Sequence, residues 1–120
     1  MVDLIEGGCF CGKVRYAFEQ NDYPSANCHC SICRRISAAP FVSWMVVPMD
    51  RFAYTQGHPK ILHSTDHGTR YFCEACGTPL ACVLAKYPES IDITTCSLDK
   101  PQDFAPKTDI YTDSKLAWVQ

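Results

Sequence analysis

The chain has 120 residues, of which 47% are hydrophobic and 20% charged, an ordinary composition for a soluble globular protein that excludes a mostly disordered chain. Its formal net charge of −2 gives no electrostatic support to nucleic-acid binding, and no stretch approaches the roughly 18 uninterrupted apolar residues of a membrane span. Residues 1–8 lack the apolar run of a signal peptide. We therefore expect a cytoplasmic protein with a single domain over residues 1–120.

The predicted secondary structure is mostly short strands separated by turns. Residues 13–19 alternate between apolar and polar, which places Val14, Tyr16 and Phe18 on one face of a strand. An apolar run at 41–47 lies between two prolines and predicts a buried strand. Further strands are predicted at residues 51–55, 60–64, 69–72, 80–85, 90–97 and 109–111. This pattern predicts a mainly β fold.

One helical segment is predicted, at residues 31–37, and it ends before Pro40. It would place Cys30 and Cys33 on the same side of the helix, near its N-terminus. Free backbone N–H groups at that end favour a thiolate over a thiol.

Seven of the nine cysteines fall into three clusters: Cys9 and Cys11; Cys28, Cys30 and Cys33; Cys73 and Cys76. An odd number of cysteines without a secretion signal favours metal binding over disulfides. Seven thiolates suit two zinc ions, one held by four sulfurs and the other by three with a position left open. A closed site of this kind stabilises a fold, whereas an open position allows chemistry.

The spacing leaves two groupings of these ligands open. In one, Cys30 and Cys33 join the third cluster in a four-cysteine ribbon, and the remaining three ligands come from distant segments. In the other, the first and third clusters form the closed site and the central cluster stands alone. The second grouping is physically better, because three closely spaced ligands can complete a site by themselves.

The third cluster has the form of a zinc knuckle, because two residues between ligands let one tight turn aim both sulfurs at one ion. Gly77 follows the second ligand and suits a backbone that needs a positive φ. Thr78 and Ser31 either donate hydrogen bonds to sulfurs or are simple turn residues, and the sequence does not separate these interpretations.

The sequence around these clusters resembles the glutathione-dependent formaldehyde-activating enzyme family, also called the GFA or centromere-protein-V family. The matching segments are GGCFCGKVRY at 7–16, CHCSICRR at 28–35, RYFCEACGTPL at 70–80 and CSLDKP at 96–101, with a tryptophan at 118. The chain is compact beside the founding enzymes and has Cys96 where the family commonly has glycine.

The resemblance implies a β-tent fold of small antiparallel sheets with zinc knuckles. It implies a structural zinc on four cysteines: Cys9, Cys11, Cys73 and Cys76. It also implies a second, catalytic zinc on Cys28, Cys30 and Cys33, with an open position for the thiol of glutathione.

The function that follows is a zinc-dependent carbon–sulfur lyase acting on a thiol–aldehyde adduct, with glutathione and a formaldehyde-like substrate, similar to an S-hydroxymethylglutathione synthase. Three thiolates make a soft site that prefers another thiol, so Cys28, Cys30 and Cys33 are expected to be ligands rather than nucleophiles. The alternative is a non-catalytic, zinc-stabilised binding module. A nucleic-acid partner, as in some relatives, is not expected from the charge, and the sequence leaves a homo-oligomer open.

Neighbouring residues allow more than one interpretation. Arg34 and Arg35 could bind a carboxylate of a glutathione-like substrate, but they could also be a solvated pair or donate to the thiolates. His29 lies between two ligands and is expected to face away from the metal.

The two remaining cysteines, Cys82 and Cys96, lie in apolar strand runs and are expected to pack in the core. As an alternative, Cys96 could enter the second site as an extra ligand and close it. Four aromatic residues are expected to fill the core or to line a cleft near the second metal: Phe41, Trp44, Phe52 and Tyr54.

Overall fold

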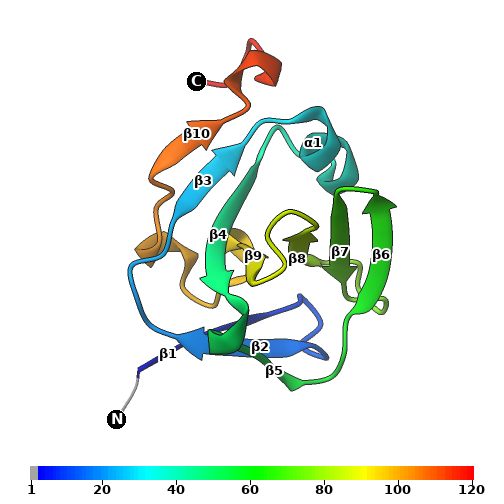
Figure 1. Ribbon diagram of the computed structural model, residues 1–120, viewed down its shortest axis with the longest axis vertical. Helices are drawn as coiled ribbons and strands as arrows, with labels where there is room; N and C mark the ends of the chain where they lie inside the picture. The colour runs from blue at the N-terminus through cyan, green and yellow to red at the C-terminus, as the bar shows by residue number, and fades with distance from the viewer. Residues whose placement is uncertain (1–2) are drawn as a thin grey trace.

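The computed structural model describes residues 3–120, which form two β-sheets and one short α-helix (Figure 1). Residues 1–2 of the predicted domain lie outside the described residues. The smaller sheet is antiparallel, with strand order β1-β2-β5; its strands are β1 (Leu4–Gly8), β2 (Arg15–Glu19) and β5 (Phe52–Gln56). Tyr16 and Phe18 of β2 are buried as the alternation predicts.

The larger sheet has the strand order β10-β3-β4-β9-β8-β7-β6. Its strands are β3 (Ser25–Cys28), β4 (Val42–Pro48), β6 (Lys60–Thr65), β7 (Gly68–Phe72), β8 (Pro79–Leu84), β9 (Ser90–Thr94) and β10 (Thr108–Ile110). The pairing of β10 with β3 is parallel and the other pairings are antiparallel, so this sheet is mixed. The helix α1 (Ser31–Ser37) follows β3, and four 3₁₀ turns lie at Met49–Arg51, Thr95–Ser97, Pro101–Asp103 and Thr112–Ser114.

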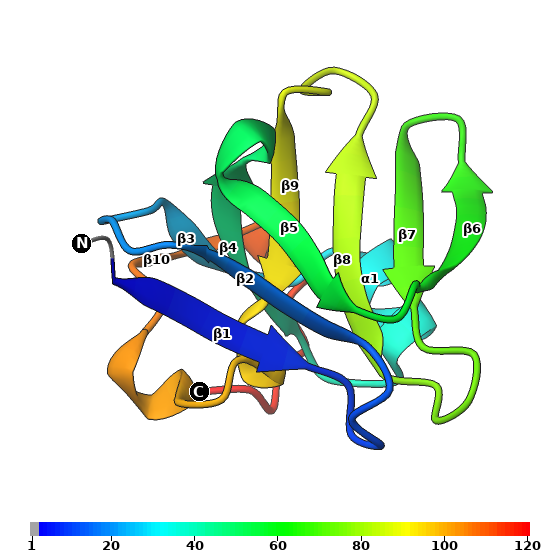
Figure 2. The ribbon, with the colours of Figure 1, turned by 90° about the horizontal axis from the view of Figure 1, so that it is seen from below.

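The two faces of the larger sheet bury two separate cores. Figure 2 shows the smaller sheet and α1 on opposite sides of the larger sheet. Because successive side chains of a strand point to opposite faces, neighbouring residues of β4 enter different cores. Met45 packs in the main core, which fills the space between the sheets. Trp44 packs in a smaller core together with Cys28, Cys33 and other residues near α1.

The prediction of a mainly β protein is confirmed, and the helix has the predicted bounds. Two strands, β1 and β3, were not predicted. The strand predicted at 90–97 is wrong in its last three residues, because the chain turns after Thr94 into a 3₁₀ turn. The Ser97 hydroxyl donates to the Thr94 carbonyl at 2.8 Å and closes this turn. None of the helices that the structure describes has the length and hydrophobicity of a membrane span.

Candidate metal sites and the adjoining pocket

The first group of cysteines lies where two hairpins meet. Cys9 and Cys11 follow β1, whereas Cys73 and Cys76 lie in the turn between β7 and β8. The four sulfurs all lie within 4.8 Å of one another. The Sγ atoms of Cys9 and Cys11 are 3.6 Å apart, and those of Cys11 and Cys73 are 3.7 Å apart. A tetrahedron with zinc–sulfur bonds of about 2.3 Å has edges of about 3.8 Å, so this donor set fits zinc.

Local backbone geometry fixes these ligands. The Cys9 sulfur accepts a hydrogen bond from Val14 N at 3.3 Å, and Gly77 N donates to the Cys73 carbonyl at 2.7 Å. Gly77 has a φ of +84°, as predicted, which a residue with a side chain rarely adopts. The turn after Cys73 therefore depends on glycine at this position.

Thr78 connects the two hairpins. Its side-chain oxygen accepts a hydrogen bond from Phe10 N at 3.1 Å and lies 3.2 Å from the Cys76 sulfur. The hydroxyl can therefore donate to the sulfur while it accepts from the backbone of the other cysteine pair. Of the two interpretations of Thr78 that the sequence left open, the structure supports the contact with sulfur.

The second group lies on the opposite face of the larger sheet. Cys28 ends β3, Cys30 is the N-cap of α1, and Cys33 is in the first turn of that helix. Their three sulfurs lie within 4.8 Å of one another, and Cys28 and Cys33 are buried. The structure thus keeps the central cluster apart from the other two, as the resemblance implies, and the mixed four-cysteine ribbon is not formed. Occupancy of the two cysteine groups by metal ions stays a prediction.

Arg70 is a member of the second site that sequence reasoning missed. Its Nη2 donates to the Cys33 sulfur at 3.3 Å. The guanidinium also lies over the Trp44 ring, 5.7 Å from the ring centre. Arg70 comes from β7, so only the register of the sheet brings it to α1. The one sequence signal for this contact is a charged residue in the predicted strand at 69–72, just before the third cysteine cluster.

Both groups contain a sulfur that ionises readily. The pKa of Cys33 is lowered to about 5, first by a hydrogen bond from the Cys28 thiol and also by the Arg70 guanidinium. That same contact with Cys33, together with burial, raises the pKa of Cys28. In the first group, the Thr78 side chain lowers the pKa of Cys76 to about 5. Since the thiolate is the form that binds metals, the lowered pKa values of Cys33 and Cys76 favour ligation by these two sulfurs.

A pocket of about 210 Å³ lies on the Arg70 side of the second group. Ile36 of α1, one turn after Cys33, lines one wall, and Trp44 and Arg70 line others. None of the three cysteines is among its described lining residues. The pocket is connected to the group through Arg70, which lines it and donates to the Cys33 sulfur, and through Trp44, which packs in the smaller core with Cys28 and Cys33.

Of the four aromatic residues predicted to fill the core or to line a cleft near the second site, Trp44 does both. Phe52 and Tyr54 pack against the main core, and Phe41 packs beside the His29 ring.

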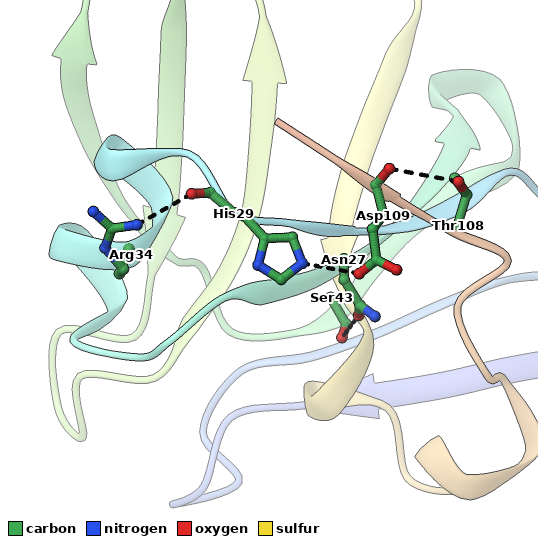
Figure 3. Close-up of polar contacts among 6 residues, drawn as sticks. All are labelled: Asn27, His29, Arg34, Ser43, Thr108 and Asp109. Carbon is green, nitrogen blue, oxygen red and sulfur yellow. Dashed lines mark hydrogen bonds and ion pairs between the residues drawn. The ribbon is translucent and has the colours of Figure 1, made fainter. Parts of the chain in front are cut away.

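The C-terminal segment is tied to the loop that carries the second group (Figure 3). His29 Nε2 lies 2.8 Å from Asp109 Oδ1, and His29 N donates to the Ile110 carbonyl at 3.1 Å. Arg34 Nη1 donates to the carbonyls of His29 at 3.3 Å and Ser114 at 2.6 Å. His29 is directed at Asp109 and lies outside the second group, as expected.

The two arginines of α1 differ in their surroundings. The contacts of Arg34 with backbone carbonyls hold α1 against the C-terminal segment, an arrangement that the sequence did not predict. Arg35 is exposed. Substrate binding by Arg34 and Arg35 stays a prediction.

The two cysteines outside the groups, Cys82 and Cys96, differ in their exposure to solvent. Cys82 is buried as predicted, and it packs in the smaller core with Cys28 and Cys33. Burial raises its pKa to about 11. The predicted core packing of Cys96 is wrong: the side chain is exposed, because β9 ends at Thr94 and the following turn carries Cys96 outward. Cys96 also lies outside both cysteine groups, so it does not close the second one.

Comparison with known proteins gives a consistent family and fold. Residues 4–114 match the model of the family described as glutathione-dependent formaldehyde-activating enzyme. A Halomonas elongata protein with the provisional name of a glutathione-dependent formaldehyde-activating enzyme is 25% identical over 133 aligned residues, which cover 98% of this chain and 80% of the relative. A crystal structure of a Rhodobacter sphaeroides protein superposes with a TM-score of 0.71 at 20% identity, covering 87% of this chain and 98% of that one. That structure supports the fold alone.

Proposed function

From the premise that the chain belongs to the glutathione-dependent formaldehyde-activating enzyme family, we propose that it is a zinc-dependent carbon–sulfur lyase acting on a thiol–aldehyde adduct. The observation that supports this most is the trio of Cys28, Cys30 and Cys33. It offers three sulfurs beside a pocket, one fewer than a closed tetrahedral site needs. The family name makes glutathione and formaldehyde the first candidate substrates.

Two metal assignments belong to this proposal. Four cysteines would hold a structural zinc, namely Cys9, Cys11, Cys73 and Cys76, and the trio would hold the catalytic one. When bound at the trio, zinc would lower the pKa of an incoming thiol and orient its sulfur.

Three further predictions from the sequence stay predictions. They are a single domain over residues 1–120, a cytoplasmic location and a possible homo-oligomer.

The residues around the trio would support the reaction in two ways. Arg70 places a positive charge beside the Cys33 sulfur, which offsets the excess negative charge of several thiolates in one largely buried site. The Trp44 ring packs against Arg70 and keeps water from one side of the guanidinium. In the reaction, the thiol sulfur bonds to the aldehyde carbon and the thiol proton ends on the former carbonyl oxygen. The reverse step breaks this carbon–sulfur bond and releases the free thiol and the aldehyde.

The test compares the wild type with two cysteine variants, Cys30→Ala and Cys96→Ala. The number of zinc ions per chain is measured for each protein. Activity is measured as the exchange of formaldehyde with glutathione and with a panel of other thiols. The wild type and Cys96→Ala should each hold two zinc ions and be active. Cys30→Ala should hold one zinc ion and be inactive, because two sulfurs no longer retain the second ion. Two zinc ions in Cys30→Ala would overturn the assignment. One zinc ion and no activity in the wild type would instead favour a zinc-stabilised binding module.

A further inference from the structure

The pocket beside the second cysteine group is almost entirely apolar. Ile36, Trp44, Leu62 and Phe72 line it, and they come from α1, β4, β6 and β7. Besides Arg70, the other lining residues are Tyr71, Gly77, Pro79 and Ala81. Among its described lining residues, Arg70 is the only one with a charged side chain. The pocket therefore offers hydrophobic contact from most of its lining residues and a single cationic group, which also contacts the Cys33 sulfur.

The one charged group of the pocket is already engaged. Arg70 Nη2 donates to the Cys33 sulfur at 3.3 Å, and the guanidinium lies over the Trp44 ring. Three thiolates around a divalent cation carry a net negative charge, and a fourth thiolate from the substrate increases it. The charge of Arg70 offsets this negative charge, so it is not free to pair with a carboxylate elsewhere on the substrate.

Glutathione fits this pocket poorly. Its body carries two carboxylates and one ammonium group, and each of these needs a partner when it leaves water. The described lining residues include no acidic side chain for the ammonium and no second cation for the carboxylates. An uncharged hydrocarbon body would instead bury apolar surface against Ile36, Leu62 and Phe72.

We propose that the pocket binds the apolar, uncharged body of an organic thiol, and that thiols of this class, rather than glutathione, are the substrates. This inference rests on the function proposed above, because it takes the second cysteine group as the place where the thiol sulfur binds. The apolar body then extends from the sulfur along the pocket between α1 and the β6–β7 hairpin.

Trp44 provides a direct readout of binding, since its ring lines the pocket. The only other tryptophan, Trp118, lies outside it and is 70% exposed. In a zinc-saturated Trp118→Phe background, tryptophan fluorescence is therefore titrated without oxygen against three probes: 2-phenylethanethiol, 2-phenylethanol and glutathione. We expect 2-phenylethanethiol to bind at least about tenfold more tightly than either of the other two.

A matched pair of variants tests the location. Leu62 lines the pocket, pairs with Arg70 across β6 and β7, and is 43% exposed. Its neighbour Ile61 points to the other face of the sheet and is 52% exposed. Leu62→Glu should weaken binding of 2-phenylethanethiol at least about tenfold, because it places a charge against the apolar body. Ile61→Glu carries the same change and should leave the affinity unaltered.

The outcomes separate this inference from the proposed function. Glutathione binding as tightly as 2-phenylethanethiol would overturn the apolar-thiol inference and leave the proposed function standing. Equal binding of 2-phenylethanethiol and 2-phenylethanol would mean that the sulfur is not coordinated, which would overturn both. Equal affinities of the Leu62→Glu and Ile61→Glu variants would overturn the placement of the thiol body in this pocket.

Discussion

Arg70 and Cys33 are 37 residues apart in the sequence, yet the guanidinium donates to the sulfur at 3.3 Å. The contact joins β7 of the larger sheet to α1, which packs on that sheet. The second cysteine group is therefore contacted by a charged residue from outside its own segment. The positive charge comes from the same hairpin that carries two cysteines of the first group at its tip.

Replacement of Arg70 should weaken the second site and leave the first unchanged. Arg70→Met removes the charge and the hydrogen bond to Cys33, and loss of such a contact to a ligand typically costs about 10–100-fold in metal affinity or activity. Arg70→Lys keeps the charge without the planar fork, so its loss should be smaller. Competition of the zinc-loaded protein with a chelator measures both affinities. Equal second-site affinities in Arg70→Met and the wild type would contradict this role.

Removal of Cys73 should destabilise the whole fold. The side chain is 2% exposed and belongs to both the first cysteine group and the main core between the sheets. Cys73→Ala should therefore lose one zinc ion and lower the free energy of unfolding by several kcal/mol, on the order of 3 or more. Thermal unfolding with parallel zinc analysis measures both effects. An unchanged melting temperature despite loss of that zinc ion would show that the ion does not stabilise the fold.

Asp92 should make stability depend on pH. Burial, together with the charge of Cys33, raises its pKa to about 6, against about 3.9 in an unfolded chain. Below pH 4 the carboxyl is neutral in both states. As the pH rises through 6, the folded protein must carry a buried carboxylate, so the stability present at low pH is lost.

The Asp92→Asn variant should therefore gain stability relative to the wild type by up to about 3 kcal/mol between pH 4 and pH 8. Urea unfolding at several pH values measures this difference in free energy of unfolding. Asp50→Asn, at an exposed position, serves as the control and should show a difference that does not vary with pH. A constant difference for Asp92→Asn as well would rule out the raised pKa.

The contact between His29 and Asp109 should hold the C-terminal segment on the protein. His29 is 1% exposed, and its ring bonds to Asp109 on β10 (Figure 3). Asp109→Ala should therefore speed amide hydrogen exchange in residues 108–114, as measured by mass spectrometry. Asp113→Ala, in the same segment at an exposed position, provides the control. Identical exchange in the two variants would show that the segment is held by other contacts.

The sequence predicted those features that depend on neighbouring residues. Pro40 marked the end of the helical segment that forms α1, and the alternation at residues 13–19 located the buried face of β2. By contrast, β1 ends in Gly7 and Gly8, which weaken a strand signal, although Gly7 is required because a Cβ there would lie 2.5 Å from the Tyr16 hydroxyl. The short strand β3 depends on its pairing with β4 and β10, which local pattern does not reveal.

The candidate sites show the same limit. Spacing alone left two groupings of the cysteines open, and the family resemblance decided between them. Arg70 was missed because its contact with Cys33 depends on the register of β7 and on where α1 packs. Cys96 was misplaced because an apolar run does not reveal that the strand ends at Thr94. Long-range register, rather than local preference, determines each of these features.

The most direct test of two separate metal sites is anomalous diffraction at the zinc edge from crystals grown under reducing conditions with zinc present. We expect two peaks on opposite faces of the larger sheet. One should lie among four sulfurs, those of Cys9, Cys11, Cys73 and Cys76. The other should lie among the sulfurs of Cys28, Cys30 and Cys33, with its fourth ligand supplied by solvent or an added thiol. A single peak shared by both groups, or a fourth protein ligand at the second peak, would contradict the account.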